Sequence, residues 1–396
     1  MITQEENELL TRVGPGTPGG ELLRRYWHPI CPAIELSEET PTRFARILGE
    51  DLVLFRDLSG RVGLIADHCA HRAASLVYGR VEERGISCAY HGWLYDTCGN
   101  ILETPPERND AVMNSIKQTA YKVQKFIGMY WAYLGPDPAP EIPQYDVWTS
   151  KKGRRRIVVH PQLDCNWLQA MENSVDPAHL QVLHQEFIGR GRKPVNTTRG
   201  FTDDVEAYDF YLTDYGIIKR RTYKSGESDE HPLIFPNILR QGNATQSRVP
   251  IDDTHTYHIF VHFDQTEDGS EIDDDSDPPV EYLEPYKNPP DALHPFAKFE
   301  WRSVISQDHT AWETQGPIAD RTREHLSYSD RGVHLLRRVL KENIERVQEG
   351  LDPLGVVRDS KRGMIDTKLF ASLSGIEGAS TRAARATEAA KAGARS

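Results

Sequence analysis

The sequence predicts an α+β fold, with a small all-β unit followed by a larger unit of strands and helices. Three observations support this prediction. Short β-branched segments separated by Gly, Asn or Asp run from about residue 43 to 135, as in a small all-β domain. The Pro-rich stretch 135–143 can continue neither a strand nor a helix and marks a boundary. Beyond it, strand-like runs and helical segments follow one another to about residue 350.

Length, composition and charge narrow the class of protein. The 396 residues suffice for two or three domains at roughly 150 residues each. Hydrophobic residues make up 38% and charged residues 27%, which excludes disordered, collagenous and coiled-coil classes. A net charge of -12 argues against nucleic-acid or anionic-membrane partners, and no apolar run approaches the roughly 20 residues of a membrane span. Five Cys, an odd number, and an acidic N-terminus without a secretory pattern predict the reducing cytoplasm.

The individual elements can be predicted in chain order. In segment 1–39, Thr3 and Glu6 form a capping-box pattern that opens a helix ending before Gly14. The all-β unit is expected at 40–143, with strands that include Arg43–Leu48, Leu52–Arg56, Val62–Ile65 and Met129–Leu134. The second unit is expected at 144–371, with strands at Arg155–His160, Ala207–Thr213, Ile217–Tyr223 and Thr256–Phe263, and helices at 166–187 and 330–350. The tail 372–396 has no apolar stripe and is expected to be flexible.

Two Cys and two His form the first candidate site. Cys69-Ala-His71 is followed by Cys88-Ala-Tyr-His91, so each half carries one Cys and one His. A tetrahedral zinc site is the simplest structural explanation, although zinc spacing usually groups Cys with Cys and His with His. The mixed halves suit a [2Fe–2S] cluster in which two Cys hold one iron and two His hold the other.

The stretches 67–72 and 88–93 around these residues resemble the two halves of the Rieske motif, including its His-Gly-Trp extension. The resemblance implies a Rieske domain at 40–143. Ala70 and Ala89 stand where the family often has Pro, which is expected to affect loop stiffness rather than ligation. The cluster ligands implied by the resemblance are Cys69, His71, Cys88 and His91.

The second candidate site lies in Asn173-Ser-Val-Asp-Pro-Ala-His-Leu-Gln-Val-Leu-His184. Asp176 reads as a helix N-cap with Pro177 at the first helical position, and Asp176 shares one helix face with His179. His179 and His184 are five residues apart and diverge on an ideal helix, so they can face one metal only if the helix is distorted. Spacing alone leaves two ordinary histidines as the alternative.

The same segment resembles the N-x-x-D-P-x-H-x4-H motif of the catalytic domain of Rieske non-haem iron oxygenases, and the two motifs come in that family's order. The resemblance implies that His179 and His184 bind a mononuclear Fe(II) with a carboxylate from later in the chain. The segment Gln307-Asp-His-Thr-Ala-Trp-Glu313 resembles the one that supplies it, so Asp308 is the predicted third ligand. Glu313 and Asp320 compete for this role, and a structural acid at a helix N-terminus is the alternative for all three.

The pattern from Arg24 to Arg338 resembles the oxygenase (alpha) component of the phthalate-dioxygenase-like branch. This implies an all-β Rieske domain beside a catalytic domain with a helix-covered antiparallel sheet, of the helix-grip type. It also implies a head-to-tail homotrimer in which one subunit's cluster feeds the neighbour's iron. Asp176 matches the family's bridging aspartate, which would hydrogen-bond His179 of its own chain and His91 of the adjacent subunit.

The resemblance implies an enzyme that activates O2 with electrons from a separate NADH-dependent flavin/iron–sulfur reductase, since the chain shows no credible nicotinamide or flavin site. Such mono- and dioxygenases hydroxylate aromatic rings or oxidatively remove O- or N-methyl groups. An aromatic carboxylate or phenolic ether is favoured here, because Arg220, Arg221 and Arg240 lie on strands expected to wall the pocket. The alternatives are a Rieske-fold electron-transfer or binding protein without mononuclear iron, and a structural zinc protein.

Overall fold

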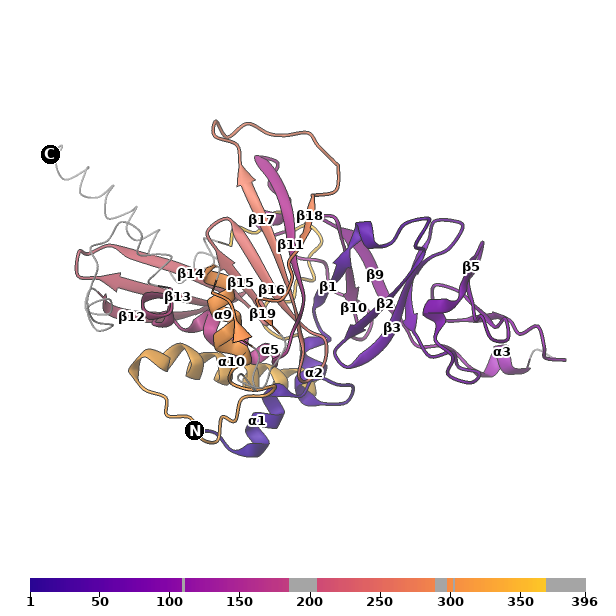
Figure 1. The fold of residues 1–396 in the computed structure, drawn as a ribbon, viewed down its shortest axis with the longest axis horizontal. Helices are drawn as coiled ribbons and strands as arrows, with labels where there is room; N and C mark the ends of the chain where they lie inside the picture. Colours follow the sequence, from indigo (N-terminus) through magenta and orange to yellow (C-terminus); the bar gives the residue numbers. More distant parts are fainter. Residues whose placement is uncertain (109–110, 185–204, 289–297, 302, 368–396) are drawn as a thin grey trace.

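The structure is a computed structural model, and it describes residues 1–108, 111–184, 205–288, 298–301 and 303–367. The expected tail 372–396 and the end of the expected helix at 166–187 lie outside the described residues. Within them, the α+β prediction is confirmed: two large antiparallel sheets are accompanied by helices that gather on the second sheet (Figure 1).

The first large sheet has six antiparallel strands in the order β1-β10-β9-β4-β3-β2. Strand β3, next to the edge strand β2, has four consecutive side chains, from Leu52 to Phe55, fully buried. The first strand, β1, precedes the expected boundary at residue 40 and pairs with β10, so the sheet begins earlier in the chain than its turn pattern indicated. The strands are β1 (Trp27–Pro32), β2 (Thr42–Ile47), β3 (Glu50–Arg56), β4 (Val62–Ala66), β9 (Ala120–Phe126) and β10 (Met129–Tyr133).

A four-stranded sheet in the order β5-β6-β7-β8 extends this unit outward. A separate hydrophobic cluster joins it to the six-stranded sheet, with Val53 and Ile65 from that sheet and Ile86 and Tyr95 from the small one. Its members are β5 (Arg80–Glu82), β6 (Gly85–Ser87), β7 (Leu94–Tyr95) and β8 (Ile101–Glu103), and the short helix α3 (Ala111–Ser115) follows.

The second large sheet has eight strands in the order β12-β13-β14-β15-β16-β17-β11-β18, antiparallel except that β18 runs parallel to β11. Helices α5 (Trp167–Val175), α9 (Val304–Glu313) and α10 (Arg331–Gln348) gather beside it (Figure 1). The strands are β11 (Gly153–Leu163), β12 (Val205–Thr213), β13 (Gly216–Tyr223), β14 (Ser228–Ile234), β15 (Ile238–Gln241), β16 (Ala244–Pro250), β17 (Thr256–Gln265) and β18 (Val280–Tyr282).

The helices that the sequence predicted are present. Helix α1 (Gln4–Thr11) is preceded by the expected capping box of Thr3 and Glu6. Helix α10 buries Val333, Leu336 and Leu340 at helical spacing, because one face of it packs on α2 (Pro18–Leu23) and α5. No helix among the described residues has both the length and the apolar character needed to cross a membrane.

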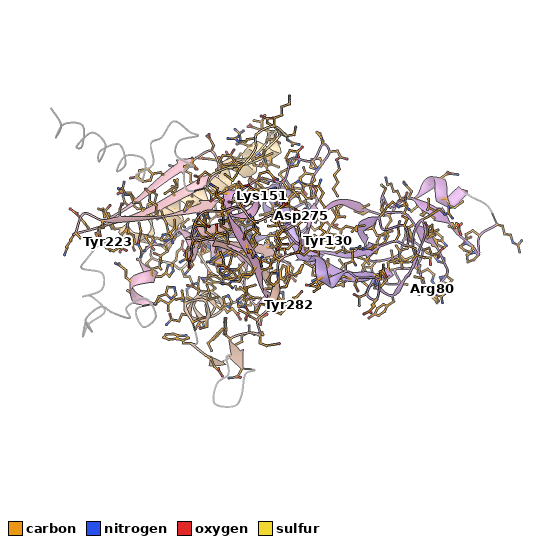
Figure 2. All side chains as sticks on the ribbon, turned by 90° about the horizontal axis from the view of Figure 1, so that it is seen from above. Arg80, Tyr130, Lys151, Tyr223, Asp275 and Tyr282 are labelled. Carbon is orange, nitrogen blue, oxygen red and sulfur yellow. The ribbon has the colours of Figure 1, made fainter. Side chains whose placement is uncertain are left out.

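The two large sheets share one continuous hydrophobic core. Trp131 on β10 and Trp148 on α4 (Asp146–Thr149) meet at a ring-centroid distance of 4.9 Å within it. The molecule is elongated, with Tyr223 on β13 near one end and Arg80 on β5 near the other (Figure 2). The small sheet therefore projects from one end, whereas α5 and α9 lie in the body of the second unit (Figure 1).

Candidate metal centres

The first centre is built from two loops of similar construction at the projecting end. Cys69 lies in the loop after β4, and its carbonyl accepts a hydrogen bond from the Ala73 N–H at 2.8 Å. Cys88 follows β6, and its carbonyl accepts from the Gly92 N–H at 2.9 Å. Each loop closes on a residue with positive φ, 58° at Ala73 and 71° at Gly92, so the backbone of both turns toward the same space.

The sulfurs and the imidazoles of this centre differ in exposure. Cys69 and Cys88 are each 3% exposed, whereas His71 and His91 are only partly buried. The His71 ring stacks on Trp93 at 4.7 Å and meets the His91 ring at 4.5 Å. A metal group held here would have its sulfur side inside the protein and its histidine side toward the surface.

The donor set fits an iron–sulfur cluster. The Tyr95 hydroxyl lies 3.0 Å from Cys69 Sγ. Burial raises the pKa of the Cys69 thiol, while the Tyr95 hydroxyl and the His71 backbone N–H lower this pKa by favouring the thiolate. His71 Nδ1 is buried without a hydrogen-bond partner, as expected of an atom reserved for a metal.

The geometry of this centre differs from that of a single zinc site. Ligand atoms around one tetrahedral zinc lie within about 4 Å of one another, since Zn–S is about 2.3 Å and Zn–N about 2.0 Å. The four predicted ligands, all of them described, form no group of three within 4.8 Å. Two irons with separate ligand pairs account for the wider spacing.

The second centre brings together His179, His184 and Asp308. One ligand atom of each lies within 4.8 Å of the other two, and among the described residues no other trio of His, Cys, Asp or Glu does so. Asp308 Oδ1 lies 3.1 Å from His184 Nε2 and 3.7 Å from His179 Nε2. Two imidazoles and one carboxylate on one side of a metal suit Fe(II) and leave positions open on the other side.

The two histidines converge because the helix is short. Helix α6 (His179–Val182) ends before His184, so the divergence expected of a five-residue spacing does not arise. The predicted N-cap is wrong in detail, since Asp176 closes α5 through its own N–H and α6 is preceded by Ala178. The Asp176 carboxylate still accepts the Ala178 N–H at 2.7 Å, which orders the link between the two helices.

Asp308 comes from α9, the helix opened by a capping box at Ser303. It is 8% exposed, and Asn173 Nδ2 on α5 lies 3.4 Å from its Oδ1. The competing carboxylates have other partners: Glu313 pairs with Lys287, and Asp320 accepts two hydrogen bonds from Thr322 on the surface.

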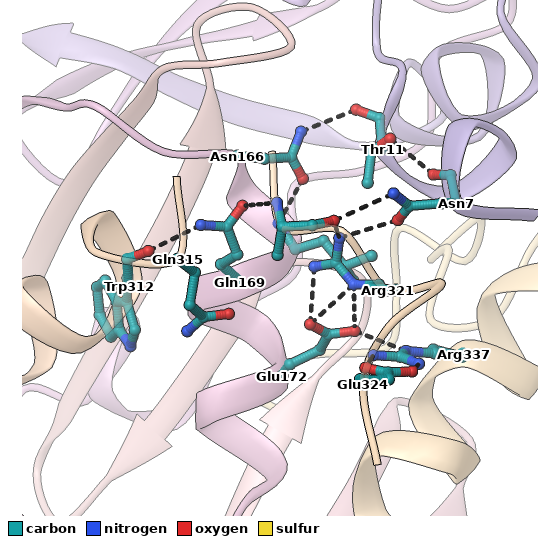
Figure 3. A network of polar contacts seen from close by, with 12 residues as sticks. Asn7, Thr11, Asn166, Gln169, Glu172, Trp312, Gln315, Arg321, Glu324 and Arg337 are labelled. Atoms are coloured by element: carbon teal, nitrogen blue, oxygen red, sulfur yellow. Dashed lines mark hydrogen bonds and ion pairs between the residues drawn. The ribbon is translucent and has the colours of Figure 1, made fainter. Parts of the chain in front are cut away.

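A buried polar network holds α5 in place, and Figure 3 shows it. Glu172 on α5 accepts from Arg321 at 2.7 Å and from Arg337 at 2.6 Å. Burial alone would raise the pKa of the Glu172 carboxyl, yet the two guanidinium groups hold this pKa below its ordinary value. Gln169 Nε2, one turn earlier, donates to the Trp312 carbonyl of α9 at 2.8 Å. Helix α5, which precedes the α6 segment, is thereby tied to α9, the helix of Asp308.

A small pocket adjoins the second centre. The sheet supplies its two buried cations, Lys219 and Arg248, and the other sheet residues that line it are His231, Leu239, Gln241 and Gln246.

The arginines predicted to wall the pocket do not line it. Arg240 lies on the opposite sheet face from its strand neighbours Leu239 and Gln241, and bonds Asp146. Arg221 pairs with Asp229, and Arg220 bonds Ser228. The sequence indicated which residues of a strand share a sheet face, but it did not indicate which of the two faces lines the pocket.

Each histidine of the second centre has a further neighbour at its other nitrogen. Asp176 Oδ2 lies 3.5 Å from His179 Nδ1, which makes no hydrogen bond to the described residues. Gln307 Oε1 lies 2.9 Å from His184 Nδ1. Gln307 was missed in the sequence, where only its position beside Asp308 could have drawn notice.

Comparisons with known proteins identify the family of this chain. A family model for the Rieske [2Fe-2S] domain matches residues 26–126. The 5,5'-dehydrodivanillate O-demethylase oxygenase subunit of Sphingobium sp. (strain NBRC 103272 / SYK-6) is 38% identical over 91% of this chain and 84% of its own length. The phthalate 4,5-dioxygenase oxygenase subunit of Pseudomonas putida is 35% identical over 90% of this chain and 89% of its own length.

Solved structures share the fold. NdmA of Pseudomonas putida CBB5 with caffeine superposes with a TM-score of 0.58 at 22% identity, covering 87% of this chain and 98% of that one. The terminal oxygenase of carbazole 1,9a-dioxygenase from Nocardioides aromaticivorans IC177 gives a TM-score of 0.60 at 18% identity, covering 86% and 96%. At such identities the likeness extends to the fold alone.

Proposed function

The chain belongs to the Rieske non-haem iron oxygenases, as an oxygenase (alpha) component of the phthalate-dioxygenase-like branch, and we propose that it acts on an anionic aromatic substrate. It is an oxidoreductase of a multicomponent system. The proposed reaction is hydroxylation of the ring or oxidative removal of an O- or N-methyl group. The relatives named above are, by their names, an O-demethylase and a dioxygenase, so both outcomes stay within the proposal.

The proposed metal ligands are those brought together in the two centres. Cys69, His71, Cys88 and His91 would hold the cluster, and His179, His184 and Asp308 would hold Fe(II). When bound, the cluster supplies electrons and the Fe(II) activates O2. The protein's own part is to exclude water from a mostly buried ligand set, to orient the imidazoles, and to hold the substrate in the adjoining pocket.

The observation that carries the substrate class is the pair of buried cations in that pocket. Arg248 is 1% exposed, and its side-chain partners are neutral oxygens of Gln246. Burial lowers the pKa of Arg248 to about 9 and that of Lys219 to about 8. Among the described residues, Lys219 donates a hydrogen bond to the backbone carbonyl of Asp176. Two buried positive charges next to a metal site favour a negatively charged ligand, so an aromatic carboxylate or a phenolate is the proposed substrate group.

Partners and location complete the proposal. We infer that electrons come from a separate NADH-dependent flavin/iron–sulfur reductase, and that the chain works as a homotrimer in the cytoplasm. The elongated shape supports the trimer, because the cluster loops and the iron site lie in separate parts of one chain (Figure 1). Asp176, whose side chain is 26% exposed, would then meet His91 of the adjacent subunit.

The test combines metal analysis with substrate screening. A purified oxygenase should be red-brown with about three irons per chain, a cluster-only protein about two, and a zinc protein none. Aromatic acids and methoxy-aromatic acids, supplied with a surrogate reductase, should drive O2 uptake with release of a hydroxylated product or formaldehyde. Failure of all anionic aromatics, with neutral aromatics turned over, would contradict the substrate class and leave the oxygenase activity intact.

Two variants sharpen the substrate test. Arg248→Met should raise KM for an aromatic acid about tenfold or more, and leave KM for its methyl ester nearly unchanged, because a charge-assisted hydrogen bond contributes about 1.5–3 kcal/mol. Lys219 is charged below pH 8 and neutral above it, so KM for the acid should rise as the pH passes about 8. This rise should vanish in Lys219→Met, whose KM should be high at every pH.

A further inference from the structure

The amide of Gln307 occupies an unusual position in the second centre. Gln307 is fully buried on α9, immediately before Asp308. Its Oε1 lies 2.9 Å from His184 Nδ1, while His184 Nε2 lies 3.1 Å from Asp308 Oδ1. Gln307 and Asp308, which are adjacent on one helix, therefore contact the two nitrogens of the same imidazole, one at each side of the ring.

This arrangement selects one tautomer of His184. A neutral imidazole carries a proton on one nitrogen and a lone pair on the other. With Oε1 of Gln307 as acceptor, the proton stays on Nδ1 and the Nε2 lone pair points toward the carboxylate of Asp308, where a metal would bind. The reversed amide would donate to Nδ1, and the ring would then carry its proton on Nε2 and be unable to bind a metal through that atom.

The other histidine is oriented differently. His179 Nδ1 has no hydrogen bond among the described residues, and its nearest acid, Asp176, lies 3.5 Å away with a quarter of its side chain exposed. His184, by contrast, is 1% exposed and bonded at 2.9 Å. His184 is therefore the histidine whose ring is fixed from within its own chain.

We propose that Gln307 is a positioning residue that fixes the tautomer and ring orientation of His184, and through it sets the Fe(II) affinity of the centre. The proposal rests on the proposed function, since it takes His179, His184 and Asp308 as the iron ligands. It goes beyond that function by assigning a role to a side chain that touches no metal. The helix that supplies the carboxylate ligand also prepares the imidazole ligand, so the correct fold of α9 delivers both.

The test measures Fe(II) affinity rather than turnover. The dissociation constant of the apo mononuclear site for Fe(II) is determined anaerobically by competition with a chelator of known affinity, with the visible spectrum of the Rieske cluster recorded in the same sample. Gln307→Met keeps the length of the side chain but removes the acceptor, and it should weaken Fe(II) binding about 10–100-fold. Gln307→Glu keeps an acceptor and should bind Fe(II) within a few-fold of the original chain, or more tightly.

A control variant separates positioning from packing. Gln169→Met also removes a buried amide between α5 and α9, but one that bonds no histidine. It should leave the Fe(II) affinity within a few-fold of the original value even if the melting temperature falls. Equal Fe(II) loss in Gln169→Met and Gln307→Met, or unchanged affinity in Gln307→Met, would overturn the proposal.

Two further results distinguish its failure from that of the proposed function. If Gln307→Met fails to fold, a more than tenfold weaker affinity in Gln307→Glu overturns the proposal instead. If His184→Ala retains Fe(II) at full affinity, the proposed iron ligands themselves are wrong. If His184→Ala loses Fe(II) while Gln307→Met does not, only the role of Gln307 is lost.

Discussion

The two candidate metal centres are built in opposite ways. The first has all four of its predicted ligands in one stretch of chain, Cys69 to His91, on two loops at the projecting end of the molecule. The second joins the α6 segment to Asp308 on α9, far along the chain. The first presents partly exposed imidazoles, whereas His184 and Asp308 of the second are buried.

The difference follows from what each centre has to do. A centre that receives and passes on electrons benefits from a histidine side near the surface, where partners can approach. A centre that handles O2 and substrate benefits from burial, because burial strengthens the fields of charged groups such as Lys219 and Arg248. The two centres also differ in how much of the chain must fold before they form. Two loops can form the first site once one small sheet folds, whereas the second site requires the whole catalytic unit.

The largest expected effect is loss of the first centre. Cys69→Ser or His71→Ala removes one of four predicted ligands, so the cluster should be absent and substrate turnover undetectable. The second centre, which shares no residue with the first, should still bind Fe(II). Visible absorption, EPR and iron per chain measure both outcomes, and a Cys69→Ser protein with the full cluster signal would remove these ligands from the proposal.

The converse experiment breaks the second centre alone. His179→Ala, His184→Ala or Asp308→Ala should abolish turnover while the cluster spectrum survives, since three ligands leave no spare. Glu313→Ala is the matched control: it removes a carboxylate from the same helix that pairs with Lys287, and it should retain Fe(II). If Glu313→Ala lost iron and Asp308→Ala retained it, Glu313 rather than Asp308 would be the iron ligand.

The contrast also explains how far the sequence could predict the protein. Strands β2, β3, β4 and β10 of the first sheet followed from β-branched runs and turns, whereas β1 was not expected. The capping box of Thr3 and Glu6 located α1. The sequence could predict the Rieske domain because the motif residues are close together in the chain. The convergence of His179 with His184 depends on where α6 ends, and helical spacing alone argued against it.

What sequence reasoning missed depends on long-range packing. Arg240 was expected in the pocket and bonds Asp146 instead, because strand alternation does not reveal which sheet face the helices cover. For the same reason, the sequence did not show that Lys219 and Arg248 line the pocket. The partners of Glu172 lie about 150 residues away, at Arg321 and Arg337, and no local pattern connects them.

The next prediction concerns electron transfer between the two centres, and its expected effect is smaller than loss of a centre. If Asp176 only orders the link between α5 and α6, Asp176→Asn should be nearly neutral, because Asn accepts the Ala178 N–H about as well. If it bridges His179 to His91 of the adjacent subunit, the variant should keep both metals and reoxidise its cluster far more slowly. Single-turnover product formation and the reoxidation rate with substrate and O2, on protein of verified iron content, decide between them.

The smallest expected effect concerns the tuning of the first centre by Tyr95. Its hydroxyl lies 3.0 Å from Cys69 Sγ, where a donor stabilises the added negative charge of the reduced cluster. Tyr95→Phe should therefore lower the reduction potential, and a differential hydrogen-bond energy of about 1 kcal/mol corresponds to about 40 mV for one electron. Tyr121→Phe is the matched control, since that hydroxyl bonds Glu50 and no sulfur. An EPR-monitored redox titration that finds equal potentials in the two variants would show that the centre is tuned by its backbone donors and exposure alone.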